Sequence, residues 1–346
     1  MLGGQVILSS ESVLNKYGAS LAGKTSMCHP SQSLSSLTFL TSRLNKPVLV
    51  TGVANDSIAG ELAVQVSAYS PATLILTARA ESRVEPIVAR IKAKNPGVSV
   101  RFLKVDLGDL KDVRRAAQEL SDVPKIDHLV AVAGVMVPPY SKTVDGVESQ
   151  FGVNYLANFL LVKELLPKVR AAGPKSSIVI CASSAVRRGE VNFDDVNYSD
   201  GETYDPLVGY GQSNAARAIF VKLLEEKLRG ENIRVFSVDP GAVATGLQRH
   251  FTGEFLERVQ EMRKSTEPMR DLDGRPVNMP PFTGTSEGAA TLITAMVDPT
   301  IENANGAFLH NNTVADDELT SHILNRDNWT KLWELSEKLI GEPFTV

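Results

Sequence analysis

The sequence predicts a single α/β domain with a doubly wound parallel sheet of about seven strands, that is, a Rossmann-type fold. From residue 47 onward, short apolar runs alternate with stretches of helical periodicity. These runs are apolar at nearly every position, which is typical of parallel strands with helices on both faces. No internal repeat or low-complexity linker divides the 346 residues. In such a fold, the ligand site lies at the carboxyl ends of the strands.

The elements follow from the pattern in order. Each expected strand is a run of β-branched residues and leucine that ends at glycine, aspartate or a small residue. In chain order the strands are 47–52, 73–78, 98–105, 128–132, 177–181, 233–238 and 306–309. The segments between them show apolar residues at helical spacing. The expected helices are 58–68, 82–94, 110–120, 149–171, 210–228 and 327–340. The folded domain is therefore expected over 48–346.

Residues 1–47 do not fit this pattern and are expected to form an irregular N-terminal extension rich in Ser and Thr. We hypothesise that 26–47 is a retained intron. Codons for Ser26-Met27-Cys28 can contain a GTATGT donor, and codons for Pro47-Val48 can contain an acceptor AG in the same phase. A genuine surface loop is the alternative, and a cDNA that retains the stretch would establish it.

Composition narrows the classes of function. The net charge of -4 disfavours a nucleic-acid-binding surface. No run of 18 apolar residues predicts a membrane span, and the N-terminus lacks the pattern of a secretory signal. The two cysteines, Cys28 and Cys181, indicate no disulfide scaffold and no metal site. A cytoplasmic location is the resulting expectation.

A glycine-containing turn follows the first strand. Between Thr51 and Gly60, only Gly52 and Gly60 are glycine, and the next helix begins at Ile58. Such a turn lets backbone N–H groups approach a pyrophosphate at a helix N-terminus. Asp56 places a negative charge near the expected phosphates, so the motif alone also fits an ordinary strand-to-helix turn.

The next two strand ends offer contacts for adenosine. Arg79 ends the second strand, where an acidic residue would bind the ribose 2′-OH of NAD and an arginine can pair with the 2′-phosphate of NADP. The alternative for Arg79 is a solvated side chain. Asp106 and Leu107 follow the third strand, where a carboxylate can accept from the adenine amino group. Asp106 is alternatively a helix N-cap.

The strongest constellation combines a strand-end serine with a helix tyrosine. Ser183 and Ser184 close the fifth strand, and Tyr210 begins the next long helix. A serine hydroxyl can polarise a carbonyl while a tyrosine donates the proton, a pair suited to carbonyl reduction. The alternative is that all three side chains only pack. After the sixth strand, the Pro240-Gly241 turn is suited to a nicotinamide carboxamide.

The order of these motifs resembles the short-chain dehydrogenase/reductase family over about 48–343, most of all its retinol-dehydrogenase-like members in filamentous fungi. The supporting segments are 134–136, 140–146, 150–154, 204–206 and 331–336. The resemblance implies that Ser184 orients the substrate, that Tyr210 is the acid/base, and that Asn154 supports a proton-relay water. It implies hydride exchange between NADP(H) and a small apolar carbonyl or alcohol, with fungal secondary metabolism as the wider expectation. The residues expected to bind the cofactor are Gly52, Ile58, Arg79, Asp106, Leu107, Ala133, Gly134, Tyr210, Asn214, Pro240, Gly241, Val243 and Thr245.

The sequence departs from the family pattern at a catalytic position. Four residues after the tyrosine the family has lysine, whereas this chain has Asn214. A positive charge about 4 Å away at an effective dielectric near 20 contributes roughly 4 kcal/mol, or about three units of tyrosine pKa. Asn214 can bind the ribose but supplies no charge. Ala131 replaces a structural asparagine, and Asp56 and Ala59 replace glycines of the loop.

Two functional interpretations follow. One is an NADPH-dependent carbonyl reductase or alcohol dehydrogenase, and the other is a pseudoenzyme that binds a ligand or partner without turnover. A large gain in turnover from Asn214→Lys would favour the first. The substrate pocket is expected among 135–140, 185–209 and 246–285. Leu247, Phe251, Phe255 and Leu256 either form its apolar wall or pack within their own helix. By resemblance, helices 149–171 and 210–228 are the surfaces expected to pair in a homodimer.

Overall fold

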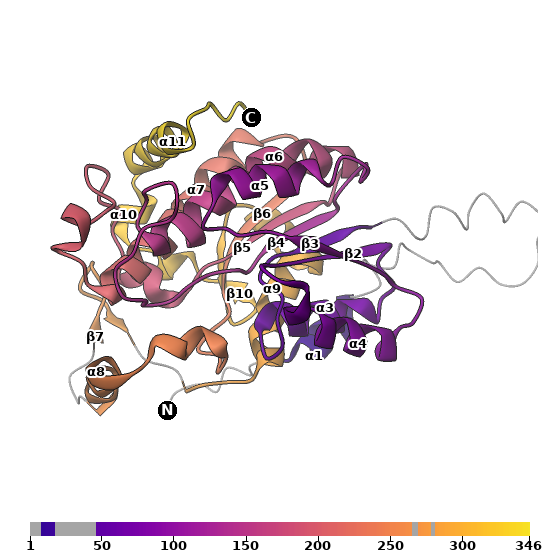
Figure 1. The fold of residues 1–346 in the computed structure, drawn as a ribbon, viewed down its shortest axis with the longest axis horizontal. Helices are drawn as coiled ribbons and strands as arrows, with labels where there is room; N and C mark the ends of the chain where they lie inside the picture. Colours follow the sequence, from indigo (N-terminus) through magenta and orange to yellow (C-terminus); the bar gives the residue numbers. More distant parts are fainter. Residues whose placement is uncertain (1–7, 18–45, 265–268, 278–280) are drawn as a thin grey trace, which may run out of the picture.

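A computed structural model describes residues 8–17, 46–264, 269–277 and 281–346, and within them the chain forms one large sheet flanked by helices (Figure 1). Its order is β10-β9-β6-β5-β4-β1-β2-β3, with β10 alone running antiparallel to its neighbour. The strands are β1 Val48–Val50, β2 Thr73–Ala78, β3 Ser99–Lys104, β4 His128–Ala131, β5 Ser177–Cys181, β6 Arg234–Asp239, β9 Phe308–His310 and β10 Thr313–Val314. Seven parallel strands confirm the predicted doubly wound fold. The strand order reverses between β1 and β4, which places the ligand site there.

Helices cover both faces of the sheet (Figure 1). One layer contains α5 Leu110–Gln118, α6 Ala157–Ala172, α7 Pro206–Lys227 and α11 Arg326–Ile340. The other contains α1 Ser10–Tyr17, α3 Ile58–Ser67, α4 Glu85–Lys94 and α9 Thr285–Val297. Smaller elements are α8 Gly253–Lys264, the hairpin β7 Met269–Arg270 and β8 Pro276–Val277, and α10 Ser321–Leu324. None of the described helices is both long and apolar enough to cross a membrane.

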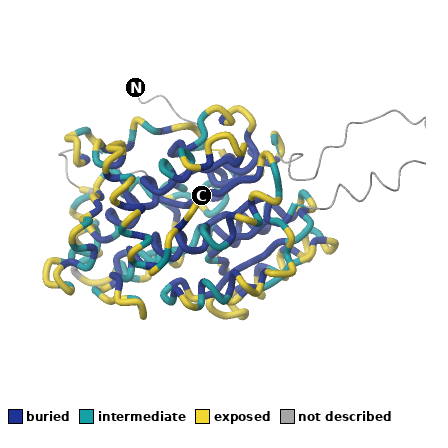
Figure 2. The backbone as a smooth tube through the Cα atoms, turned by 90° about the horizontal axis from the view of Figure 1, so that it is seen from above, coloured by how far each residue is buried: buried dark blue, intermediate teal, exposed yellow. Residues whose placement is uncertain are grey.

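The sheet separates two hydrophobic cores, which appear as the buried centre of Figure 2. The core beneath α6, α7 and α11 contains a cluster of aromatic rings. Phe159 lies at its centre, with ring centroids 5.3 Å from Phe220, 5.1 Å from Trp333 and 5.3 Å from Phe344. The core beneath α3 and α9 is mainly aliphatic. Because both faces are packed, the strands are held rigidly and their ends can position a site.

Two helices begin differently from the prediction. The tyrosine helix α7 begins at Pro206 rather than 210, because the Asp205 carboxylate accepts from the N–H groups of Leu207 and Val208 and proline suits the first helical position. Tyr210 therefore lies in the second turn. The helix expected over 149–171 opens with a π-helical stretch, Phe151–Leu156, before α6.

Four of the described helices, α1, α8, α9 and α10, were not among the predicted ones, and two of these four add to the layer that covers one face of the sheet. The first is α9, in which an almost uninterrupted run of small and apolar residues gave no periodic signal. The second is α1, which corrects the expectation of an irregular segment over its eight residues. Val13 and Leu14 of α1 are buried, and the Ser10 hydroxyl lies 3.0 Å from that of Ser286 on α9. Most of the proposed intron lies outside the described residues, so that hypothesis stays a prediction.

Candidate active site

Two adjoining cavities lie at the carboxyl ends of the central strands. The first, called the cofactor cavity because most residues predicted to bind the cofactor line it, is formed by the β1–α3 loop, the ends of β2 and β3, and residues 245–247 and Arg249. The substrate cavity is lined by the ends of β5 and β6 together with α7 and α8. Residues that line both are Ile58, Val132, Gly134, Val135, Thr245 and Leu247. A ligand in one cavity can therefore reach a ligand in the other.

The β1–α3 loop is built around Gly52 and Ser57. Gly52 has φ +76°, and a Cβ there would lie 2.7 Å from the Cα of Ala133, so only glycine fits. The Ser57 hydroxyl accepts from the N–H groups of Ala54 at 3.1 Å and Gly60 at 2.9 Å, and donates to the Ala54 carbonyl at 2.7 Å. A serine thus closes a turn in which two expected glycines are absent.

The two altered positions of this loop behave differently. Asp56 adopts φ +54°, a left-handed conformation that glycine favours, and its exposed carboxylate lies in the wall of the cofactor cavity. Ala59 is 1 % exposed and packs in the aliphatic core. Asp56 therefore remains a source of unfavourable charge, whereas the methyl group of Ala59 faces mainly the protein.

An arginine cluster, defined as Arg79, Arg83 and Arg249, lines the adenosine end of the cofactor cavity. Burial together with the charges of Arg79 and Arg83 lowers the pKa of Arg249. Among the residues that the structure describes, no carboxylate forms an ion pair with any of the three. Sequence reasoning found only Arg79. Arg249 lies 170 positions further along the chain, so only the folded structure brings it to this cavity.

The third strand end resolves an alternative left open by the sequence. The N-cap of α5 is Asp109, whose carboxylate accepts from the N–H groups of Lys111 and Asp112. Asp106 instead accepts from the N–H of Gly108 at 2.9 Å and stays exposed at the cavity, beside Leu107. Asp106 is therefore available to a ligand.

The end of β4 is held in place although Ala131 replaces the asparagine that the family pattern has there. Ala131 is fully buried, and the buried Thr51 hydroxyl accepts from the N–H groups of Val132 at 3.0 Å and Ala133 at 3.1 Å. Ala133 and Gly134 consequently line the cofactor cavity, as expected. The departure at Ala131 leaves the strand end intact.

Asn154 holds the segment that follows β4. Its Oδ1 accepts from the N–H of Val135 at 2.7 Å, and its Nδ2 donates to the Val135 carbonyl at 2.9 Å and the Ser213 hydroxyl at 3.0 Å. The Asn154 main-chain carbonyl accepts from the side chains of Asn158 at 2.6 Å and Arg217 at 2.5 Å. Asn154 thus positions a cavity wall, and the proton-relay water stays a prediction.

Tyr210 lines the substrate cavity. The serine whose side chain lowers the pKa of Tyr210 through a hydrogen bond is Ser183, not the expected Ser184. Ser183 also accepts from the N–H of Ala185 at 3.2 Å. Among the described residues, the Ser184 hydroxyl has no hydrogen bond, and Ser184 lines the cavity. Ser184 therefore remains free to bind a substrate oxygen, and Ser183 is a neighbour of Tyr210 that the family pattern did not indicate.

The sixth strand end forms the wall between the cavities. Pro240, Gly241 and Val243 line the substrate cavity, and Thr245 lines both. Gln248, which sequence reasoning missed, donates to the Val243 carbonyl at 2.7 Å and accepts from the Thr245 N–H at 2.8 Å.

The substrate cavity is largely apolar. Leu247 and Phe251 line it as expected, whereas Phe255 packs on Phe251 and Leu256 is exposed outside the cavity. Two of the four residues considered for the apolar wall, Leu247 and Phe251, therefore line the cavity. Further apolar lining residues, which the sequence analysis did not name singly but which lie within the expected segments 185–209 and 246–285, are Leu207, Val259, Met262 and Phe282.

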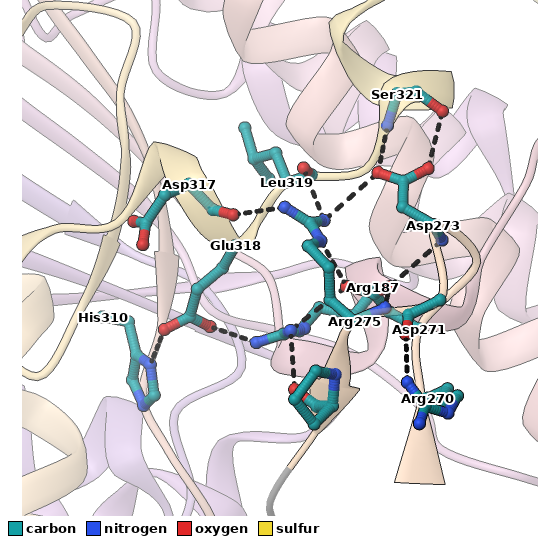
Figure 3. Close-up of polar contacts among 12 residues, drawn as sticks. Arg187, Arg270, Asp271, Asp273, Arg275, His310, Asp317, Glu318, Leu319 and Ser321 are labelled. Atoms are coloured by element: carbon teal, nitrogen blue, oxygen red, sulfur yellow. Dashed lines mark hydrogen bonds and ion pairs between the residues drawn. The ribbon is translucent and has the colours of Figure 1, made fainter.

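An ion-pair network centred on a buried aspartate holds the β7–β8 hairpin (Figure 3). Asp271, whose side chain is 0 % exposed, pairs with Arg187 at 3.1 Å and Arg275 at 2.8 Å. Arg275 also donates to the carbonyls of Asp317 and Leu319. The β7–β8 hairpin is therefore tied to the segment after β5 and to the segment before α10.

Comparison with known proteins decides the family. A family model described as short chain dehydrogenase matches residues 46–254. The chain belongs to the short-chain dehydrogenase family. It is 31 % identical to human retinol dehydrogenase 14 over 86 % of each chain, and 30 % identical to the short-chain dehydrogenase/reductase prx1 of Penicillium roqueforti over 70 % of this chain and 71 % of that protein.

Solved structures agree on the fold. An uncharacterized protein from Mycobacterium paratuberculosis matches with a TM-score of 0.64 and 25 % identity over 87 % of this chain and 95 % of its own. The Pseudomonas aeruginosa RhlG/NADP active-site complex matches with a TM-score of 0.54 and 22 % identity over 76 % of this chain and 93 % of its own. The short-chain dehydrogenases are oxidoreductases that use a nicotinamide cofactor, and the retinol-dehydrogenase-like resemblance is confirmed.

Within this family, Asn214 is the departure that matters most. Asn214 is fully buried, its Nδ2 donates to the Tyr210 carbonyl at 2.8 Å, and its Oδ1 accepts from Arg217 at 3.3 Å. It lines neither cavity. The expectation that Asn214 binds the cofactor stays a prediction, and in this structure both polar groups of its side chain are hydrogen-bonded within α7.

Proposed function

We propose that this short-chain dehydrogenase is an NADP(H)-dependent oxidoreductase that interconverts a carbonyl and an alcohol on an apolar small molecule. The observation that carries the proposal is the position of Tyr210 and Ser184 in an apolar cavity that adjoins a second cavity lined by three arginines, none of which pairs with a carboxylate of the described residues. When bound, NADP(H) supplies or accepts the hydride at the carbonyl carbon.

The described residues fit NADP(H) rather than NAD(H). Arg79, Arg83 and Arg249 present guanidinium donors that suit a 2′-phosphate, since arginine pairs with phosphate in bidentate geometry. No carboxylate ends β2, where NAD(H) would need an acceptor for the ribose 2′-OH. Gly52 leaves the close approach to the backbone that a pyrophosphate requires.

The chain's own residues supply the proton chemistry. The free hydroxyl of Ser184 would donate to the carbonyl oxygen and hold it in place. The Tyr210 hydroxyl would deliver its proton to that oxygen during reduction, and would accept the proton of the alcohol during oxidation. Leu247, Phe251 and Met262 would bury the apolar body of the substrate.

NADPH consumption by the purified protein, measured with a panel of apolar aldehydes and ketones, tests the proposal. We expect turnover with NADPH, little with NADH, and loss of turnover in Tyr210→Phe. NADPH binding without turnover on any member of the panel would instead favour the pseudoenzyme interpretation. A cytosolic location, a homodimer and a role in fungal secondary metabolism stay predictions.

A further inference from the structure

The missing lysine is accompanied by an unexpected cation on the same helix. Arg217 lies seven residues after Tyr210 in α7, close to two full turns, so the two residues share one face of the helix. Arg217 is 3 % exposed and lines the substrate cavity together with Tyr210. A buried arginine without a charged partner is unusual and calls for a functional explanation.

Every hydrogen bond found for Arg217 goes to a neutral acceptor. Nε donates to the Asn154 carbonyl at 2.5 Å, and the two terminal nitrogens donate to the Ala133 carbonyl at 2.7 Å and to Asn214 Oδ1 at 3.3 Å. Among the described residues, no carboxylate lies within ion-pair distance of it. Its positive charge is therefore held in place without a carboxylate to neutralise it, and it can act on neighbouring groups in the buried site.

We propose that Arg217 performs, from position i+7, the electrostatic role that the family assigns to a lysine at i+4, stabilising the Tyr210 phenolate. Arg217 acts through Tyr210 and is a positioning residue rather than a catalytic one. The inference rests on the proposed function. In carbonyl reduction the O–H bond of Tyr210 breaks, the substrate oxygen gains the proton, and Tyr210 keeps the electron pair as a phenolate until solvent returns a proton.

The charges around Tyr210 agree with this role. Burial raises the pKa of Tyr210, and the Arg217 charge opposes that rise, whereas Cys181 on β5 and Asp239 on β6 add to it. A hydrogen bond from Ser183 also lowers the pKa of Tyr210. Arg217 is the nearby group that favours the phenolate through charge.

The same contacts explain why position 214 is asparagine. Asn214 Oδ1 accepts from Arg217, so a lysine at 214 would bring a second cation against the guanidinium. The two positions are therefore coupled. A lysine at 214 is expected to help only when Arg217 is absent.

The direct test measures the acidity of residue 210 in the protein without cofactor. Difluorotyrosine placed at position 210 titrates at lower pH than tyrosine, and ¹⁹F NMR follows its ionisation. Removing the guanidinium in Arg217→Met should raise this pKa, and Arg217→Met combined with Asn214→Lys should bring it back towards the wild-type value. Asn214→Lys alone should give no gain in turnover, contrary to what the sequence alone leads us to expect of an active enzyme, because Arg217 already supplies the charge.

Activity provides the second readout. For alcohol oxidation, which needs the phenolate, the rate rises with pH through the pKa of Tyr210, so Arg217→Met should move the rising limb to higher pH. At neutral pH its kcat should fall by about 10- to 100-fold. Arg229→Met, at an exposed arginine just beyond α7, is the matched control and should change neither readout.

The outcomes separate this inference from the proposed function. An unchanged pKa of residue 210 in folded Arg217→Met overturns the role of Arg217, whatever the substrate. If Arg217→Met does not fold, Arg217→Gln takes its place, because it removes the charge but keeps a hydrogen-bond donor, and an unchanged pKa of residue 210 in folded Arg217→Gln overturns the role equally. A shifted pKa without turnover leaves the role of Arg217 standing and counts against the oxidoreductase.

Discussion

The adenosine end and the catalytic end of the site differ in how closely they follow the family pattern. At the adenosine end, Arg79 and Asp106 stand where the pattern places them, and the structure adds Arg83 and Arg249 around them. At the catalytic end, the tyrosine is kept but its lysine is lost, and Arg217 brings charge from another position. The difference teaches that local motifs predict the residues of the adenosine end, whereas at the catalytic end the charge that we propose to replace the lysine comes from another position of the same helix.

The largest expected effect is at the catalytic end. Tyr210→Phe removes the proton donor but keeps the ring, so kcat should fall by about 10²- to 10⁴-fold. NADPH affinity should stay near the wild-type value, which fluorescence titration of bound NADPH would show. Equal turnover by Tyr210→Phe would remove Tyr210 from the chemistry.

Substitution of the two serines tests which hydroxyl group at the catalytic end contacts the substrate. Ser184→Ala removes the hydroxyl that is free to polarise the substrate, and kcat should fall by roughly 10²- to 10³-fold. Ser183→Ala removes one hydrogen bond to Tyr210 and should lower kcat by about tenfold. Steady-state kinetics of both variants shows which substitution lowers kcat more. A larger loss for Ser183→Ala than for Ser184→Ala would make Ser183 the substrate-orienting residue.

The adenosine end should respond in binding rather than in rate. Arg79→Ala removes charge-assisted hydrogen bonds to a 2′-phosphate, so NADPH affinity should weaken by about 10- to 100-fold. NADH lacks that phosphate, and its affinity should hardly change. Arg249→Ala should act in the same direction, while Arg101→Ala, at an exposed arginine paired with Asp122, serves as a control. An equal loss for both cofactors would contradict the assignment.

The smallest expected effect is a gain in NADPH affinity. Asp56→Gly removes a negative charge from the cofactor cavity and relieves a left-handed backbone, so NADPH affinity should rise by about two- to fivefold. Asp56→Asn removes only the charge and separates the two causes. Weaker binding in both variants would show that Asp56 contacts the cofactor favourably.

The sequence was sufficient for the features that depend on local pattern. The apolar runs at 73–78 and 177–181 predicted strands that the structure has at the same residues. The tyrosine and its neighbouring serines followed from motif order. The features that the sequence did not predict depend on tertiary packing. Arg217 looks in sequence like any helix arginine, and only its burial between Ala133 and Asn154 identifies its role.

The N-terminal helix marks another limit of sequence reasoning. Val13 and Leu14 are two adjacent apolar residues in a polar segment, too few to define a helical period. Their burial against α9 supplies the stability that the segment lacks alone. Tertiary contact, rather than intrinsic propensity, forms this element.

The measurement that tests the central claim most directly is equilibrium binding of NADPH to the purified protein, followed by nicotinamide fluorescence, with NADH as the comparison. The account predicts saturable binding in the micromolar range and clearly weaker binding of NADH, because only NADPH engages Arg79, Arg83 and Arg249. Absence of binding up to millimolar concentration, or equal affinity for both cofactors, would contradict it.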